Sequence, residues 1–306
     1  MLKKLILFSL LEDLYSPKEI DEIWNFLQTN QSELKQKGLL EILPKIVEQD
    51  RTSAAIFPDR MAFGKIYSKQ NGIFSGSDLI NETFEVLDPK SEIKILVKNG
   101  QKISTNQEIA DIKSSLFCLL VGERTVLNFL CHLSGVATKT AEFVNLLKNT
   151  KTQLLDSRKT LPGYRNLQKM AVKDGGGQNH RFGLFDQILV KNNHVAAAGS
   201  VSLAIQKVLQ KWGQKYPILV ETQDLGEVRE ALEFKNQITR IMLDNMDLKT
   251  LKKALELIKN QTKTEYTGNV SLENIKKIAE TGVDFVSIGG NLTLETYRLD
   301  LSMKIE

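Results

Sequence analysis

The chain has 306 residues, of which 42% are hydrophobic and 25% charged, which suits one large or two smaller globular domains with a substantial core. Its net charge of +4 is too small to indicate nucleic-acid binding by itself. The two cysteines, Cys118 and Cys131, stand in apolar surroundings without a Cys/His ligand spacing, which favours buried structural thiols over a disulfide or a metal site.

Residues 1–40 predict helices, because Leu, Ile and Phe recur at helical spacings. The start imitates a signal peptide, with Lys3-Lys4 before LILFSLL, but Glu12 and Asp13 follow at once and no small-residue cleavage pattern is present. No uninterrupted run reaches the ~18 apolar residues that span a membrane. We therefore expect an amphipathic first helix and a soluble, cytoplasmic protein.

Residues 51–115 predict short strands separated by Gly, Pro and Asn. The predicted strands are AAIFP, AFGKIYSK, GIFSG, EIKILVKNGQKI and EIADIK, with Asn99-Gly100 at the turn of a hairpin. Residues 119–150 then predict a long helix, broken near Gly135, at the junction of two domains. We place an N-terminal α/β domain at 1–122, against which the tail 293–306 packs, and a catalytic domain at 123–292.

From residue 151 onward, six short apolar runs alternate with helical stretches. The runs are QLLD (153–156), QILV (187–190), PILVE (217–221), RIMLD (240–244), TEYT (264–267) and DFVSI (284–288). This alternation predicts parallel strands joined by crossover helices. No GxGxxG or P-loop opens a helix, so an open nucleotide-binding sheet loses support. The pattern favours a (β/α) barrel with fewer than eight strands.

Polar, charged or glycine residues follow every one of these runs, and active sites of such barrels lie at the carboxyl ends of their strands. The cations come early in the chain and suit an acidic substrate, because arginine matches carboxylate and phosphate oxygens. They are Arg158, Lys159, Arg181 and Lys191. The triple glycine Gly175–Gly177 precedes His180-Arg181, which favours a substrate role for His180.

Carboxylates and glycines complete the same predicted edge. Glu221 and Asp244 suit a hydrated Mg²⁺ that takes its other ligands from phosphates. The later loops suit a phosphate held by backbone N–H groups, because glycine permits close approach. They contain Thr267, Gly268, Asn269, Ser287, Gly289 and Gly290. The order indicates an organic acid near the first strands and a phosphorylated sugar near the last.

Several residues have alternative interpretations. Lys191 is either a surface lysine or a Schiff-base nucleophile. Asp156 suits a partner that orients the neighbouring cations. From pattern alone, Arg124 in GERTVLN is a charge on a helix surface.

Long motifs give the chain a resemblance to a known family. LLDSRKTLPGYR, KDGGGQNHRFGLFDQILVKNNH, GERTVLNFLCHLSGVAT, IMLDN and LDLSMKI resemble quinolinate phosphoribosyltransferases from about residue 40 to the end. The resemblance implies an open α/β sandwich before an incomplete barrel, and a homodimer. It also implies the Mg²⁺-dependent reaction of quinolinate with phosphoribosyl pyrophosphate, which gives nicotinate mononucleotide, carbon dioxide and pyrophosphate.

The resemblance also implies roles for the residues. Arg158, Lys159, His180, Arg181 and Lys191 surround the quinolinate carboxylates, with Lys159 and Lys191 as candidates to assist the chemistry. Glu221 and Asp244 face the ribose and the metal ion, and the two later loops cradle the 5′-phosphate. Arg124 matches an arginine that reaches the neighbouring subunit's site. Asn192 and Asn269 stand where the family pattern has an acidic residue and a glycine.

Three other functions compete with this hypothesis. One is a related transferase with another acceptor, of the kind found in molybdenum operons, which KNNH disfavours. The second is an aldolase that uses Lys191 as a Schiff base. The third is a non-catalytic barrel that binds a metabolite, and the cation set disfavours it because buried like charges without an anion are costly.

Overall fold

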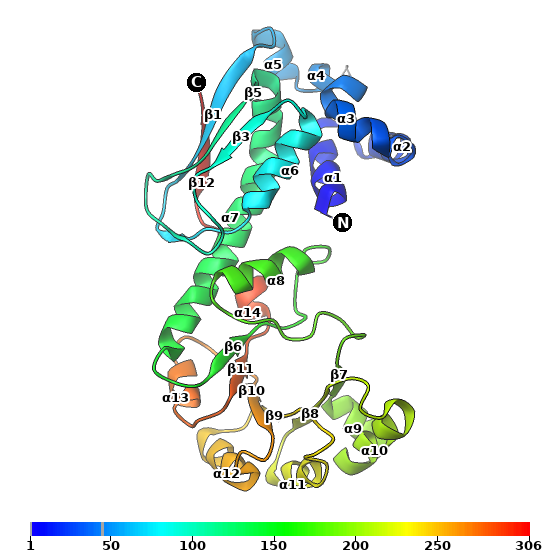
Figure 1. Ribbon diagram of the computed structural model, residues 1–306, viewed down its shortest axis with the longest axis vertical. Helices are drawn as coiled ribbons and strands as arrows, with labels where there is room; N and C mark the ends of the chain where they lie inside the picture. The colour runs from blue at the N-terminus through cyan, green and yellow to red at the C-terminus, as the bar shows by residue number, and fades with distance from the viewer. Residues whose placement is uncertain (1, 44–45) are drawn as a thin grey trace. The chain divides into compact units, whose positions relative to one another are not determined.

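The computed structural model describes residues 2–43 and 46–306, which divide into two units (Figure 1). The first unit comprises the residues up to Thr138 together with Tyr297–Glu306, and the second comprises Lys139–Thr296. Helix α7 (Leu116–Leu147) contributes to both. The boundary expected between residues 122 and 123 falls inside the same helix, and the division into functional domains stays a prediction.

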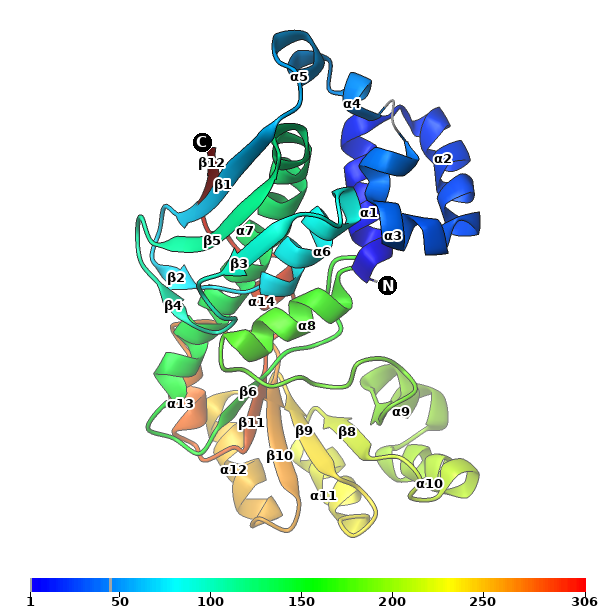
Figure 2. The same cartoon turned by 45° about the horizontal axis from the view of Figure 1, so that its top comes forward.

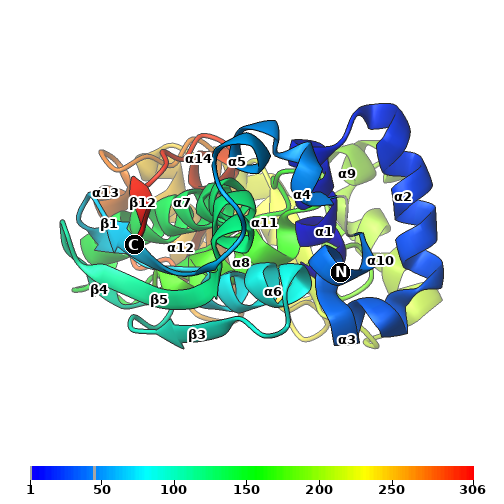
Figure 3. The same ribbon diagram turned by 90° about the horizontal axis from the view of Figure 1, so that it is seen from above.

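Helices begin the first unit, as the apolar spacing predicts, and Figure 3 shows them grouped together. They are α1 (Leu2–Leu14), α2 (Pro17–Thr29), α3 (Gln31–Ile42), α4 (Ile46–Gln49) and α5 (Arg51–Ile56). The prediction of a strand at AAIFP is wrong, because most of this segment lies in α5. Asp50 caps that helix by accepting the Ser53 N–H at 3.2 Å.

Four strands of the first unit form an antiparallel sheet in the order β12-β1-β5-β3. Its strands are β1 (Met61–Ser68), β3 (Glu92–Ile95), β5 (Glu108–Ser115) and β12 (Leu301–Ile305). One face packs on α7, where a Cβ added to Gly64 would lie 3.0 Å from a Leu119 methyl carbon. Helix α6 (Ser77–Leu87), which the strand-like sequence did not reveal, also lies against α7, with Phe84 beside Gly122.

Asn99 and Gly100 form a turn, but the predicted hairpin is wrong. Strand β3 pairs with β5, whereas β4 (Lys102–Ile103) pairs with β2 (Gly72–Ile73). A type I′ hairpin turn needs positive φ at both central residues, and of these two only Gly100, at 81°, has it. The Asn99 side chain instead accepts the N–H groups of Gly76 and Ser77 at 2.8 and 2.9 Å, at the start of α6.

Helix α7 continues through Gly135, so the predicted break there is wrong. A Cβ at this position would lie 1.9 Å from the Tyr297 carbonyl oxygen, and glycine therefore lets the returning chain approach the helix. By length and composition α7 could cross a membrane, but 67% of its apolar window is buried within the protein, as in a core helix. Cys118 on α7 is buried, which raises its pKa to about 12, and Cys131 is likewise a free thiol.

Six parallel strands form the sheet of the second unit, and all six predicted strands are confirmed. Their order is β6-β11-β10-β9-β8-β7. The bounds are β6 (Gln153–Leu155), β7 (Ile188–Val190), β8 (Ile218–Thr222), β9 (Arg240–Asp244), β10 (Lys263–Thr267) and β11 (Phe285–Ser287). Figure 2 shows β8 to β11 fanned side by side.

Helices connect these strands, as crossovers between parallel strands require. They are α8 (Arg165–Asp174), α9 (Asn192–Ala198), α10 (Val201–Trp212), α11 (Leu225–Glu233), α12 (Leu248–Ile258) and α13 (Ile275–Ala279), and α14 (Gly290–Thr293) follows the last strand, β11. A buried apolar cluster of Leu189, Leu219 and Met242 lies within the sheet. Each of these residues stands two positions before a polar residue at its strand end, and residues two apart share one face of a strand. The apolar cluster therefore lies directly beneath the polar residues at the strand ends.

Candidate active site

A cavity of about 800 Å³ opens at the carboxyl ends of the parallel strands. It is lined by every predicted site residue of the second unit: Arg158, Lys159, His180, Arg181, Lys191, Glu221, Asp244, Thr267, Gly268, Asn269, Ser287, Gly289 and Gly290. Asp156 and Asn245 also line it. The structure thus brings together side chains from six strand ends, as the alternation of strands and helices predicts.

Arg124 lies apart from this set. It is an exposed residue of α7 in the first unit and is not among the described residues that line the cavity. Its assignment to a neighbouring subunit's site stays a prediction.

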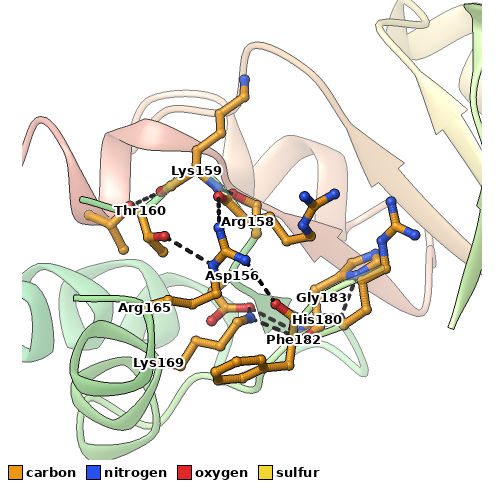
Figure 4. Close-up of polar contacts among 12 residues, drawn as sticks. Asp156, Arg158, Lys159, Thr160, Arg165, Lys169, His180, Phe182 and Gly183 are labelled. Atoms are coloured by element: carbon orange, nitrogen blue, oxygen red, sulfur yellow. Dashed lines mark hydrogen bonds and ion pairs between the residues drawn. The ribbon is translucent and has the colours of Figure 1, made fainter. Parts of the chain in front are cut away.

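Asp156 links the loop after β6 to the loop that contains His180 (Figure 4). It is 1% exposed, and its Oδ1 accepts from Lys169 Nζ and from the His180 backbone N–H, both at 2.7 Å. Lys169 Nζ also donates to the His180 carbonyl at 3.0 Å. Burial raises the pKa of Asp156 and lowers that of Lys169, and their mutual attraction opposes both shifts. The notion that Asp156 orients neighbours agrees with this geometry, although its direct cationic partner, Lys169, was not predicted.

Arg165 on α8 ties the two loops together (Figure 4). Its guanidinium donates to Thr160 Oγ1 at 3.2 Å, to the Phe182 carbonyl at 3.3 Å and to the Arg158 carbonyl at 3.5 Å. These bonds hold the backbone on either side of the cations, and they leave the Arg158 side chain able to face the cavity. Arg165 is the last residue of the motif LLDSRKTLPGYR, but its role could be assigned only from the fold.

The cationic side chains of the site lie close enough for the charge of one to disfavour the charged form of another. Arg181 is 6% exposed, and its pKa is lowered by burial and by the charge of Arg158. Arg181 Nη1 donates to the Gln187 carbonyl at 3.1 Å. Arg158 Nε is buried without a hydrogen-bond partner within the described residues. A cavity that holds such groups is suited to an anion that supplies the missing acceptors.

The motif KNNH ends a strand and begins a helix. Lys191 is the N-cap of α9, and its N–H donates to His194 Nδ1 at 2.9 Å, so His194 caps the helix. The Lys191 ammonium lies 3.6 Å from Glu221 Oε1. Burial raises the pKa of Glu221, and the charge of Lys191 opposes that shift.

Two amide side chains hold Asp244. Asn192 Nδ2 donates to Oδ2 and Asn245 Nδ2 donates to Oδ1, each at 3.1 Å. The acid-to-amide departure at Asn192 therefore supplies a donor to this carboxylate. Asp244 is the last residue of β9, and Glu221 is the penultimate residue of the neighbouring strand β8. One or two carboxylates beside substrate phosphates are a usual Mg²⁺ environment, so the donor set fits that ion.

Glycines shape the far end of the cavity. Gly268 has φ of 98°, and a Cβ there would lie 2.1 Å from Asn245 Oδ1. A Cβ on Gly289 would lie 2.9 Å from Lys159 Cδ, so the lysine stem crosses directly over this glycine. Both glycines line the cavity, so its wall at these positions is backbone, which suits phosphate binding by backbone N–H groups.

Glu265 was not predicted as a site residue. It is fully buried on β10, with Oε1 3.5 Å from His180 Nε2 and Oε2 2.5 Å from Arg240 Nη1. Its signal in the sequence is a lone acidic residue inside the run TEYT. The partners could not be identified without the fold, because His180 and Arg240 are distant in sequence.

Comparisons with known proteins agree with this geometry. Residues 50–134 match the N-terminal and residues 136–304 the C-terminal domain of the family described as quinolinate phosphoribosyl transferase. The chain is 41% identical over 241 residues to a probable nicotinate-nucleotide pyrophosphorylase [carboxylating] of Synechocystis sp., covering 78% of this chain and 81% of that protein. The corresponding Bacillus subtilis protein is 38% identical, with 89% and 94% covered.

Solved structures give the same result. The NadC structure from Streptococcus pyogenes has a TM-score of 0.81 at 32% identity, covering 95% of this chain and 98% of that one. Nicotinate-nucleotide pyrophosphorylase from Ehrlichia chaffeensis has a TM-score of 0.79 at 31% identity, covering 86% and 98%. These similarities extend over both units.

Proposed function

Because the chain belongs to the quinolinate phosphoribosyltransferase family, we infer that it transfers the phosphoribosyl group of phosphoribosyl pyrophosphate to quinolinate, in NAD biosynthesis. Transfer and decarboxylation give nicotinate mononucleotide, carbon dioxide and pyrophosphate. The observation that supports this inference most strongly is the single cavity that joins a cation cluster, two carboxylates and two glycine loops. These are the groups required by a diacid, a ribosyl cation and a phosphate.

The cations would bind the pyridine dicarboxylate. Arg158 and Arg181 offer planar donors that match carboxylate oxygens, and the backbone bonds around Arg165 hold their loops. When the acid is bound in this way, its ring nitrogen is in line with the ribose C1′. This orientation lowers the entropic cost of reaching the transition state. Lys159, which crosses Gly289, would lie between the acid and the phosphate end.

The carboxylates would serve the sugar. As the C1′–O bond to pyrophosphate breaks, positive charge develops on the ribose, and Glu221 and Asp244 stabilise it. They would also hold Mg²⁺, which when bound neutralises charge on the leaving pyrophosphate oxygens. Asn192 and Asn245 keep Asp244 oriented for either task.

Decarboxylation follows from the new bond. Attack by the pyridine nitrogen makes the ring cationic, so the ring stabilises the electron pair that the breaking C2–carboxylate bond leaves on C2 as carbon dioxide departs. A proton from water then adds to C2 and gives the C2–H bond of nicotinate mononucleotide. Lys191 and Lys159 supply positive charge beside the ring. These reaction steps require no Schiff base.

The finer features of the family belong to the same proposal. The six-stranded sheet would be an incomplete (β/α) barrel, since β6 and β7 are the edge strands of its order. The first unit would be an open α/β sandwich. We further propose a cytoplasmic homodimer in which Arg124 reaches the neighbouring subunit's cavity, a role that its exposure on α7 permits.

A direct assay tests the reaction. Purified protein with quinolinate, phosphoribosyl pyrophosphate and Mg²⁺ should form nicotinate mononucleotide and carbon dioxide in equal amounts, and chelation of Mg²⁺ should stop it reversibly. A folded protein that forms neither product would refute the proposed function. Trapping of an adduct on Lys191 by borohydride would support the aldolase alternative instead.

Mixed dimers test the shared site. Arg124→Ala and Lys191→Ala subunits, each inactive alone, should regain activity when exchanged, because one of the two cavities then has both residues. Exchanged dimers without activity would show that Arg124 does not serve its neighbour.

A further inference from the structure

Glu265 is a buried carboxylate that the proposed reaction leaves unused. It stands two residues before Thr267 on β10 and thus on the face of the strand that leads to the cavity. Glu265 is level with Met242 of the neighbouring strand β9, which belongs to the buried apolar cluster of Leu189, Leu219 and Met242. A buried charged group beside this cluster is costly unless it is paired, so its presence calls for a specific role.

Arg240 balances the charge of Glu265. Its Nη1 lies 2.5 Å from Oε2, and its guanidinium lies 4.0 Å from the centre of the Phe285 ring, which favours a cation over its face. Burial raises the pKa of Glu265, but the contact with His180 and the charge of Arg240 outweigh burial and lower it. The carboxylate therefore stays ionised, with one oxygen committed to Arg240.

The other oxygen faces His180. Oε1 lies 3.5 Å from Nε2, and neither atom has a hydrogen-bond partner among the residues that the structure describes. The second ring nitrogen, Nδ1, accepts the Arg181 N–H at 2.7 Å, which assigns the proton of the neutral ring to Nε2. The imidazole thus directs its N–H toward a buried acceptor.

The backbone of His180 is anchored separately. Asp156 accepts its N–H and Lys169 donates to its carbonyl, so these bonds set the chain without setting the ring. The ring itself is held at Nδ1 by the Arg181 N–H, and its Nε2 faces the Glu265 carboxylate on the other side. The ring lines the cavity next to Arg181, which makes its orientation part of the shape presented to substrate.

We propose that Glu265, neutralised by Arg240, is a positioning residue that holds the His180 ring and thereby shapes the quinolinate end of the cavity. This proposal rests on the proposed function. It assigns Glu265 an effect on one substrate, whereas a purely structural ion pair in the sheet would affect both substrates alike.

A double-mutant cycle between Glu265 and His180 tests this role. We expect Glu265→Gln to lower kcat/KM for quinolinate by about tenfold, because the His180 Nε2–H then faces a neutral amide instead of a carboxylate, and to change KM for phosphoribosyl pyrophosphate by less than about twofold. In a His180→Ala background the same change should lower kcat/KM by less than about twofold, because its effect passes through His180. Glu233→Gln, the same change at an exposed position of α11, is the control and should have no effect.

The outcomes separate the competing interpretations. Equal losses for both substrates, or full multiplication of the two effects in the double variant, would overturn the proposal. If Glu265→Gln fails to fold because Arg240 loses its partner, the Arg240→Met, Glu265→Gln variant removes both charges and should show the same quinolinate defect. Failure of that variant to fold would mark the pair as structural and also overturn the proposal. A wild-type protein without activity on quinolinate would instead refute the proposed function.

Discussion

Gly268→Ala should disable the site while leaving most of the fold intact. Alanine at φ of 98° costs about 1–2 kcal/mol of stability from backbone strain alone. Its Cβ would lie 2.1 Å from Asn245 Oδ1, so the Asn245 side chain must move away and Asp244 loses the donor now at 3.1 Å. A hydrogen bond to a charged group contributes roughly 1.5–3 kcal/mol, which corresponds to about a 10- to 100-fold loss of kcat/KM.

Gly282→Ala is the matched control. Gly282 has a similar φ of 87°, but the nearest atom to its added Cβ is Lys151 Cε at 4.0 Å. Both variants should therefore unfold at similarly lowered temperatures in calorimetry, whereas only Gly268→Ala should lose product formation. Asn245→Ala should reproduce that loss, and combining it with Gly268→Ala should add little. Near-normal activity of Gly268→Ala, or a large further loss in the combination, would refute the reasoning.

Three other variants test the electrostatics of the cavity. Burial raises the pKa of Glu221, so its protonated form stabilises the fold below its unfolded pKa of about 4.5 and that stabilisation is lost as pH rises through the folded pKa. Glu221→Gln should therefore raise the unfolding temperature at pH 7 and lose activity; an unchanged or lower value would contradict this sign. Arg181→Ala should lose quinolinate binding in calorimetry with its circular dichroism unchanged, and retained affinity would exclude it from the acid subsite. Asp156→Asn leaves Lys169 buried without its counter-ion and should lower the free energy of unfolding, measured with urea, by about 3–5 kcal/mol. Adding Lys169→Met to this variant should restore most of that loss. No recovery in that pair would point to the bond with the His180 N–H as the main contribution.

The six strands of the second unit and the residues at their ends could be read from the sequence. Each strand is a short apolar run, and the residues that follow it are adjacent in sequence, so the site residues at the strand ends needed only the rule that parallel strands end at one edge. His180 and Arg181 directly follow none of these strands and were assigned from the preceding glycines and from the family resemblance. Glycine and asparagine were less informative. Asn99 and Gly100 form a turn without a hairpin, and Gly135 accommodates a chain that crosses the helix rather than breaking it.

Local hydrophobic periodicity decides which residues end the strands, so most of the residues that meet at the cavity could be predicted. How those residues are held could not be predicted before the fold was known. The contacts of Asp156 with Lys169, of Asn192 with Asp244 and of Glu265 with His180 join segments that are separated along the chain. Such contacts depend on side-chain distances and on burial, and these arise only when the sheet has formed and its helices have packed.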